Sequence, residues 1–229
     1  MNPDDSFDRP VWASLAGPLA PLSVGGPLAR RFAHDVNLFA SAADDSAPAL
    51  QALADLVTAG DPVYVLQRGP VVVPPGLQPA RLAMGVQMVA TRPMPVLDGA
   101  DAVVDLGDAD AAEMLALATL TQPGPFLART HAMGRFIGIR QGGRLLAMAG
   151  ERMRFAGGTE VSGVCTHPDA RGRGHARLLS ALVAARIAAR GDRPFLHAWT
   201  HNRAAIALYE SLGFELRTEV HVAVLQRGG

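Results

Sequence analysis

The sequence contains no lysine. All 21 of its basic residues are arginine, and 21 acidic residues balance them, so the formal net charge of the 229-residue chain is zero at pH 7. Without lysine the chain can form neither a Schiff base with a carbonyl substrate nor the phosphate-binding lysine of a P-loop. A neutral chain also creates no overall field that would attract nucleic acid or an anionic membrane surface. We therefore expect neither of these as a partner.

Cysteine is almost absent, since Cys165 is the only one. A single cysteine excludes an intrachain disulfide and a cysteine-based structural zinc site, and it fits a reducing compartment. Asp4, Asp5 and Asp8 stand where a signal peptide would carry its basic cluster, and no apolar run reaches the length of a membrane span. We expect a cytoplasmic protein.

The second half of the chain alternates between strand and helix patterns. Short apolar or alternating runs predict strands, and helices are predicted where a periodic apolar run follows a capping residue or a glycine loop. The expected strands are 102–106, 136–141, 145–153, 159–166, 194–200, 214–216 and 219–225. The expected helices begin after 110, 174 and 202 and end near 122, 190 and 212, with a further helical turn within 126–131.

The first hundred residues are less regular, because proline and glycine are dense at 17–27, 70–79 and 93–99. Between these stretches we expect one helix, at 47–59, and strands near 62–67 and 82–90. An order of strand, helix, strand, strand is compatible with a degenerate half-copy of the second half. We predict two domains, a smaller N-terminal α/β lobe over 1–98 and a larger domain over 99–229.

Residues 161–177 indicate a strand, a tight glycine loop and a helix. Gly172 and Gly174 remove the Cβ atoms that would keep a ligand away from the backbone. Because the loop opens a helix, unpaired N–H groups and the positive end of the helix dipole converge there. Arg171, Arg173 and Arg177 surround the loop. The segment is therefore a predicted diphosphate site.

Two motifs together resemble the GCN5-related N-acetyltransferases (GNAT), and most of all their FR47-like branch. Arg171-Gly-Arg-Gly-His-Ala176 is similar to the family pattern Arg/Gln-x-x-Gly-x-Gly/Ala, and residues 202–214, from Asn202 through Leu-Tyr to Leu-Gly-Phe214, resemble a later family segment. The resemblance covers about 102–225 and not the first hundred residues. It implies an α/β (α+β) fold, in which a central, mostly antiparallel and splayed sheet is flanked by helices.

The resemblance also implies acetyl-CoA as co-substrate and no metal. The backbone of the glycine loop would hold the diphosphate, and the edge of the preceding strand would pair with the pantetheine arm. Gly163 is suited to the bulge by which members of this family separate two central strands. The residues expected to bind the co-substrate are Val164, Cys165, Thr166, Arg171, Gly172, Arg173, Gly174, His175, Ala176 and Asn202.

The reaction implied by the resemblance is direct transfer of an acetyl group to a primary amine, without a covalent enzyme intermediate. Tyr209 would protonate the leaving thiolate, and Glu160 is the candidate base that deprotonates the amine. A backbone N–H near Val164 or Cys165 would stabilise the oxyanion. The alternative interpretation of Glu160 is an exposed strand charge, and that of Tyr209 is packing against the sheet.

The acceptor is expected to be a small-molecule or peptide amine, with the first lobe covering or completing its site. Transfer to a hydroxyl or of a longer acyl chain stays open, as does a monomer or a homodimer. The alternative function is a non-catalytic acyl-CoA-binding sensor or scaffold. His197 and His201 are separated by a strand end and a loop, so we expect no metal site there.

Overall fold

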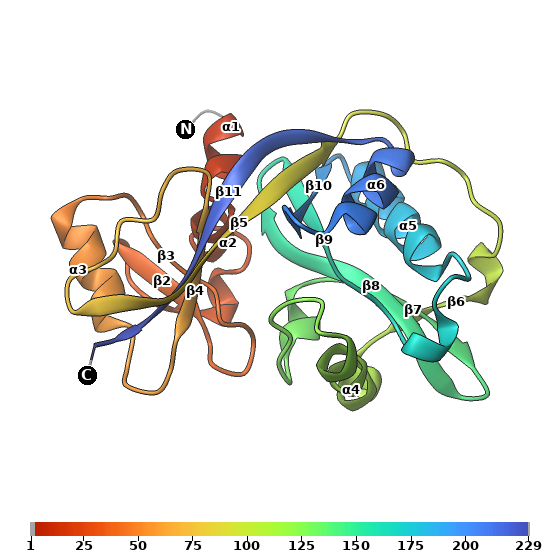
Figure 1. Cartoon of the computed structure of the whole chain (residues 1–229), viewed down its shortest axis with the longest axis horizontal. Coiled ribbons are helices and arrows are strands. Elements are labelled where there is room, and N and C mark those ends of the chain that lie inside the picture. Colours follow the sequence, from red (N-terminus) through yellow and green to blue (C-terminus); the bar gives the residue numbers. More distant parts are fainter. Residues whose placement is uncertain (1–2, 229) are drawn as a thin grey trace.

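A large twisted sheet runs through the whole molecule, and the computed structural model describes residues 3–228 (Figure 1). The strands are β1 (Ser23–Gly25), β2 (Ala29–Phe32), β3 (Ala40–Ala42), β4 (Val63–Gln67), β5 (Leu77–Ala90), β6 (Val103–Leu106), β7 (Phe136–Gln141), β8 (Arg144–Phe155), β9 (Gly158–Thr166), β10 (Arg193–Trp199) and β11 (Phe214–Arg227). The α-helices are α1 (Pro3–Asp8), α2 (Pro10–Leu15), α3 (Ala47–Asp55), α4 (Ala111–Thr121), α5 (His175–Ala189) and α6 (Arg203–Leu212). Short 3₁₀ turns are η1 (Ala20–Leu22), η2 (Ala100–Ala102), η3 (Asp108–Asp110), η4 (Thr130–Met133) and η5 (Pro168–Ala170).

The large sheet has the strand order β4-β11-β5-β10-β9-β8-β7-β6, and a small second sheet has the order β1-β2-β3. Neighbours in the large sheet run antiparallel, except that β9 and β10 run parallel. The mixed α/β class with a mostly antiparallel central sheet, predicted above, is therefore confirmed.

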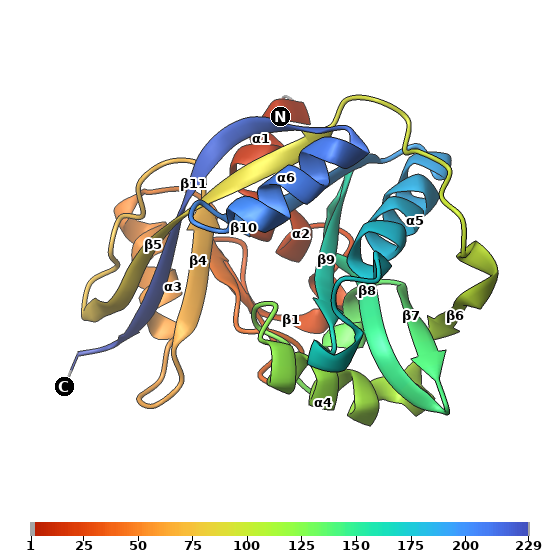
Figure 2. The ribbon, with the colours of Figure 1, turned by 45° about the vertical axis from the view of Figure 1, so that its right-hand side comes forward.

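Helices cover both faces of the large sheet. On one face α5 and α6 pack through Leu179, Val183 and Tyr209 against strand residues such as Leu196 (Figure 2). On the other face α1 and α2 pack against β10 and β11, and α4 packs against β8 and β9. Alternate residues of one strand contribute to the two cores, as Leu196 and Phe195 do on β10.

Local chemistry explains where α6 begins and where α5 and α6 end. Asn202 caps α6, because its Oδ1 accepts a hydrogen bond from the Ala205 N–H at 3.2 Å, and Gly213 ends that helix at φ +98°. Gly191 follows α5 at φ +88°. Both ends lie where the sequence predicts them. Among the described residues, no helix is long and apolar enough to span a bilayer.

The first half of the chain contributes strands to the same sheet as the second half. The first-half strand β5 lies between β10 and β11, and β4 pairs with the other side of β11. In Figure 1 the long β5 and β11 pass from the lobe around α3 to the lobe around α5. The predicted boundary between two domains at residue 98 stays a prediction. The large sheet continues across it, because strands from both sides of this boundary belong to that sheet.

Several expectations for local structure need correction. The helix expected at 47–59 ends at Asp55, and the two strands expected after Gly213 are the single strand β11, whose register shifts around Arg217. The sequence analysis did not predict α1, α2 or β1 to β3. These short elements have too little periodicity to be recognised, and they are stabilised by burial of side chains such as Val11, Leu15 and Phe32.

The parallel pairing of β9 and β10 is short. It joins Arg193, Pro194 and Phe195 to Gly158, Thr159 and Glu160, and no pairing between the two strands is recorded beyond that point. Figure 2 shows β9 and β10 separating from there. The large sheet therefore opens at its middle, and this opening is where the expected site residues meet.

Candidate functional site

A β-bulge at Gly163 sets the direction of the side chains that follow it. Met148 pairs with Cys165 and Gly150 with Ser162, so Gly163 and Val164 together oppose one residue of β8. Gly163 has a φ of +63°, which an L side chain rarely adopts. The bulge turns Val164 to the α5–α6 face and Cys165 to the α4 face. The bulge predicted at Gly163 is confirmed.

The opening between β9 and β10 holds a cavity of about 210 Å³, which we call the central cavity. Its walls come from both faces of the sheet and from both halves of the chain. They are Phe39, Tyr64, Leu66, Gly85, Gln122, Pro123, Gly124, Pro125, Arg152, Val164, His197, Ala198, Trp199, Asn202, Ala205, Tyr209, Val220 and Val222. Three predicted site residues, Val164, Asn202 and Tyr209, thus line one cavity.

Glu160 lies beside this cavity, fully buried, at the centre of an ion-pair cluster. Its carboxylate accepts two hydrogen bonds from Arg152, from Nε at 2.8 Å and from Nη2 at 2.7 Å. The backbone N–H of Met153 donates to Oε2 at 3.3 Å, and Nδ1 of His197 lies 2.7 Å from Oε1. A second bulge makes this possible, because Arg152 and Met153 together oppose Glu160 in the β8–β9 ladder.

The tautomer of His197 follows from its neighbours. Gln87 donates its amide N–H groups to the Phe7 carbonyl at 2.8 Å and its Oε1 accepts from Arg217 at 3.0 Å, which fixes the orientation of the Gln87 amide. The same Gln87 nitrogen lies 3.1 Å from Nε2 of His197, so Nε2 must accept and Nδ1 must carry the proton donated to Glu160. Both ring nitrogens of His197 are therefore in use.

The surroundings of Glu160 decide how basic it is. Burial raises the pKa of this carboxyl, but the charge and hydrogen bonds of Arg152, with His197, outweigh burial and lower the pKa to about 2. A carboxylate with so low a pKa, and with its lone pairs already occupied, is a weak proton acceptor. The alternative of an exposed strand charge is wrong, since the side chain is buried.

The pKa of Tyr209 is shifted in the opposite direction from that of Glu160, so its hydroxyl stays protonated. It stands on α6 with 9 % of its surface exposed and lines the central cavity. Burial, reinforced by the negative charge of Glu160, raises the pKa of the Tyr209 hydroxyl to about 12. At neutral pH the phenol is therefore neutral and can only donate a proton.

The glycine loop forms as the sequence predicts. Gly172 and Gly174 have φ values of +77° and +79°, and a Cβ added at either would meet nothing within 4 Å. For the amides from 172 to 177, no backbone acceptor is recorded in the described part of the chain. Gly174 is the N-cap of α5 and provides no side-chain cap. Space and unpaired N–H groups thus coincide at the start of the helix.

The arginines around the loop differ in their contacts. Arg173 hydrogen-bonds to Gln141 and to the carbonyl of Asp169, at 3.3 and 3.1 Å. Arg171 is exposed, Arg177 is half-buried, and neither has a recorded ion pair among residues 3–228. Their positive charge at a helix N-terminus opposes the dipole unless an anion is bound.

Cys165 and Thr166 end the strand before the loop. Cys165 packs with the α4 core, and burial raises the pKa of its thiol to about 11, which makes it an unreactive side chain. The hydroxyl of Thr166 is buried without a recorded partner among the described residues. Of the two, only Thr166 has an unused polar group.

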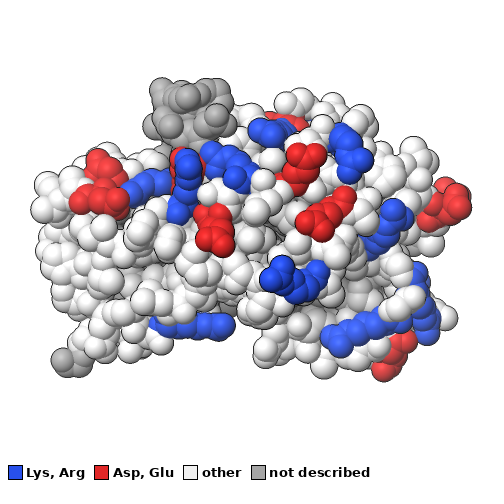
Figure 3. All heavy atoms as spheres, turned by 45° about the horizontal axis from the view of Figure 1, so that its top comes forward, with Lys and Arg blue, Asp and Glu red and all other residues white. Residues whose placement is uncertain are grey.

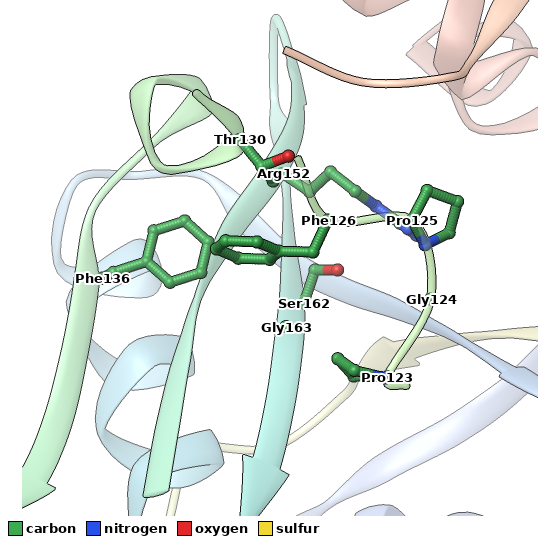
Figure 4. Close-up of a pocket in the computed structure, with 9 residues that line it drawn as sticks. All are labelled: Pro123, Gly124, Pro125, Phe126, Thr130, Phe136, Arg152, Ser162 and Gly163. Carbon is green, nitrogen blue, oxygen red and sulfur yellow. The ribbon is translucent and has the colours of Figure 1, made fainter. Parts of the chain in front are cut away.

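The segment 122–125, between α4 and η4, closes the central cavity near Arg152. Gln122 has a φ of +51°, and it is the only non-glycine residue with positive φ in the described chain. Figure 4 shows Arg152 extending towards Pro125 and Gly124, in a small adjoining pocket that Ser162 and Phe126 also line. The guanidinium also lies 4.9 Å from the ring centre of Phe39.

The sequence analysis missed Arg152, His197 and the aromatic walls Phe39, Tyr64 and Trp199. One signal was available for Arg152, because Glu151 and Arg152 follow the apolar run 145–150 within one expected strand, and a charge in a buried strand needs a partner. The aromatic walls carry no such signal, because the fold alone brings them to the cavity. No group of His, Cys, Asp and Glu that could hold a metal ion occurs within residues 3–228.

Comparisons with known proteins show which family and which solved structures this chain is similar to. The FR47-like protein family matches residues 136–222. A GNAT-family protein from Novosphingobium aromaticivorans shares 44 % sequence identity over 97 % of this chain and 98 % of its own, with a TM-score of 0.90. A GCN5-related N-acetyltransferase from Kribbella flavida, 20 % identical over 97 % and 96 % of the two chains, has a TM-score of 0.63 and shows the fold alone. No curated protein sequence matches the chain.

The Glu160 cluster predicts how stability depends on pH. Because the pKa of Glu160 is lowered by folding, from 4.5 to about 2, its contribution is complete above pH 4.5 and is lost as the pH falls towards 2. The shift corresponds to about 3 kcal/mol. We expect the free energy of unfolding, measured in urea from pH 7 to pH 2, to fall more steeply for the native protein than for Glu160→Gln.

The matched control is Glu210→Gln, which removes an exposed carboxylate from α6. Its pH profile should run parallel to that of the native protein. Equal slopes for Glu160→Gln and the native protein would mean that ionisation of Glu160 is not coupled to folding.

Proposed function

The chain belongs to the GNAT family of N-acetyltransferases, and on that basis we propose that it transfers an acetyl group from acetyl-CoA to a primary amine. The observation that carries the proposal is the central cavity, which joins the two faces of the sheet where β9 and β10 separate. Tyr209 and Asn202 line it from the α6 face, whereas Phe39 and Leu66 line it from the opposite face. A donor and an acceptor can therefore approach one point from opposite sides.

The residues present fit acetyl-CoA. The open loop at Gly172 and Gly174, with unpaired amides at the start of α5, suits the diphosphate, and Arg171 and Arg177 supply the positive charge. The amide-bearing arm suits the edge of β9 around Val164 and Thr166, which faces the gap left by β10. Acetyl-CoA supplies an acetyl group whose C–S bond breaks as the amine nitrogen forms the new C–N bond.

Tyr209 donates the proton that the departing sulfur needs. Its pKa of about 12 keeps the hydroxyl protonated until charge develops on the sulfur, but it exceeds the pKa of a free thiol, about 8.5, so the transfer is completed only as the Tyr209 oxygen regains a proton. The amine nitrogen loses one proton to water, and water then returns one proton to the Tyr209 oxygen. A backbone N–H near Val164 stabilises the carbonyl oxygen, since the bulge at Gly163 leaves one residue of β9 without a ladder partner.

Glu160 has a positioning role in this scheme. Its carboxylate is occupied by Arg152, Met153 and His197, so it fixes those groups at the wall of the cavity instead of accepting the proton of the amine. That Glu160 acts as the general base stays a prediction, which a pH–rate profile of Glu160→Gln tests. An unchanged ascending limb supports the positioning role, and loss of that limb supports the base.

The alternative function is a non-catalytic acyl-CoA sensor with the same fold. One observation favours the enzyme, namely that Tyr209 places a protonated hydroxyl at the cavity that acceptor and co-substrate would share. We place the protein in the cytoplasm, where an unpaired buried thiol such as Cys165 is common. Figure 3 shows acidic and basic side chains interspersed on the face that it presents, so that this face has no field of one sign that would attract a polyanionic partner.

Replacing Gly174 tests the diphosphate site. Gly174→Asp puts a side chain at a φ of +79° and a negative charge where the diphosphate binds, so the Kd for CoA should rise on the order of 100-fold or more. Gly191→Asp, at φ +88° beyond the other end of α5, carries a similar backbone strain and should keep the native Kd. Calorimetric titration measures both. If Gly174→Asp still binds CoA with a micromolar Kd, the glycine loop is not the diphosphate site.

Replacing Tyr209 tests the proton donor. Tyr209→Phe keeps the ring and removes the hydroxyl, so kcat should fall by about 10²-fold while the Kd for acetyl-CoA is unchanged. Ser211→Ala removes an exposed hydroxyl from the same helix and should not change kcat. Thiol release and calorimetry give the two quantities. If Tyr209→Phe lowers kcat and weakens the binding of acetyl-CoA to the same extent, the hydroxyl contributes to packing and not to proton transfer.

A further inference from the structure

Within the described residues, the wall of the central cavity contains no carboxylate. None of the residues that line it is Asp or Glu. The one buried carboxylate nearby is Glu160, and its two oxygens already accept from Arg152, Met153 and His197. A cationic group entering the cavity therefore finds no free carboxylate to pair with, so long cationic acceptors such as polyamines are disfavoured.

Three side chains that line this space, by contrast, have unused donors. Arg152 binds Glu160 through Nε and Nη2 only, and no hydrogen bond of its Nη1 is recorded within residues 3–228. Nη1 lies beside the backbone of Gly124, since a Cβ added there would stand 3.8 Å from it. Figure 4 shows this end of Arg152 directed at the 122–125 segment. The hydroxyl of Tyr64 and the indole N–H of Trp199 likewise have no recorded hydrogen bond among the described residues.

The rest of the acceptor side is apolar. Phe39, Leu66, Val220 and Val222 line it, and the ring of Phe39 packs edge-on against Tyr64 at 5.9 Å between centroids. A cavity of about 210 Å³ is smaller than the common range for drug-sized ligands, about 300 to 1,000 Å³. The lining therefore suits a small molecule with an apolar body and one anionic, hydrogen-bond-accepting group.

We propose that the acceptor is a free amino acid with an apolar or aromatic side chain, whose carboxylate binds Nη1 of Arg152 and whose amine reaches the opening between β9 and β10. This deepens the proposed function and rests on it. A guanidinium held in place by Glu160 binds a carboxylate at little further entropic cost, because its rotamer is already fixed. Arg152 is then a specificity-determining residue, and Glu160 positions it.

The first experiment compares two amines that differ in the carboxylate alone. Thiol release from acetyl-CoA is measured with phenylalanine and with 2-phenylethylamine, each corrected for its fraction of neutral amine. A charge-assisted hydrogen bond favours phenylalanine by about 10- to 100-fold in kcat/KM. Leucine and 3-methylbutylamine form a second pair with an aliphatic body. Equal use of both members of each pair overturns the proposal.

The second experiment uses Arg152→Lys, which keeps a positive charge opposite Glu160 but has one terminal nitrogen in place of two. KM for phenylalanine should rise about 10- to 100-fold, with KM for 2-phenylethylamine unchanged. A role in stability alone would change both amines equally, and that result overturns the proposal. If Arg152→Lys does not fold, the double variant Arg152→Gln/Glu160→Gln, which replaces the ion pair by a neutral one, gives the same comparison.

The outcomes separate the two proposals. If no amine of either kind releases thiol although acetyl-CoA binds, the proposed acetyl transfer to amines fails, and this inference with it. If simple amines are acetylated and the amino acids are not preferred, acetyl transfer stands and only the assignment of Arg152 to a carboxylate is wrong.

Discussion

The carboxylate of Glu160 is the contact on which the arrangement of the site depends. It stands on the last residue of β9 that pairs with β10, and it hydrogen-bonds to Arg152 on β8 and to His197 on β10. One buried anion thus fixes the three strands at the place where the sheet divides. A buried carboxylate without these partners would cost several kcal/mol, so opening the sheet and assembling the cluster depend on each other.

The cluster also connects the site to the first residues of the chain. His197 accepts from Gln87, which contacts both the Phe7 carbonyl and Arg217, and Arg217 pairs with Asp8 at 2.7 Å. A buried polar path therefore leads from α1 to the cavity wall. The N-terminal half supplies Phe39, Tyr64 and Leu66 to the cavity as well. The first half therefore contributes to the wall of the central cavity.

The sequence predicts best what local chemistry determines. The glycine loop, the Asn202 cap, the Gly163 bulge and the strands β7 to β9 follow from turn residues and short-range periodicity. It could not reveal that β5 enters the sheet between β10 and β11, because no local pattern records which distant strand is a partner. For the same reason Arg152 and His197 were not recognised as partners of Glu160, and the exact walls of the cavity stayed unknown.

The position of β5 has a consequence for biosynthesis. Its neighbours β10 and β11 begin at Arg193 and Phe214, so β5 is synthesised long before either strand is available to pair with it. Until then β5 exposes two unpaired edges, a condition that invites association with other nascent chains. In the finished sheet the exposed residues 78–81 of β5 pair with β11 alone, and the proline and the charge at Pro79 and Arg81 discourage a further strand from pairing with the free edge. The large sheet becomes continuous only when β11 pairs between β4 and β5.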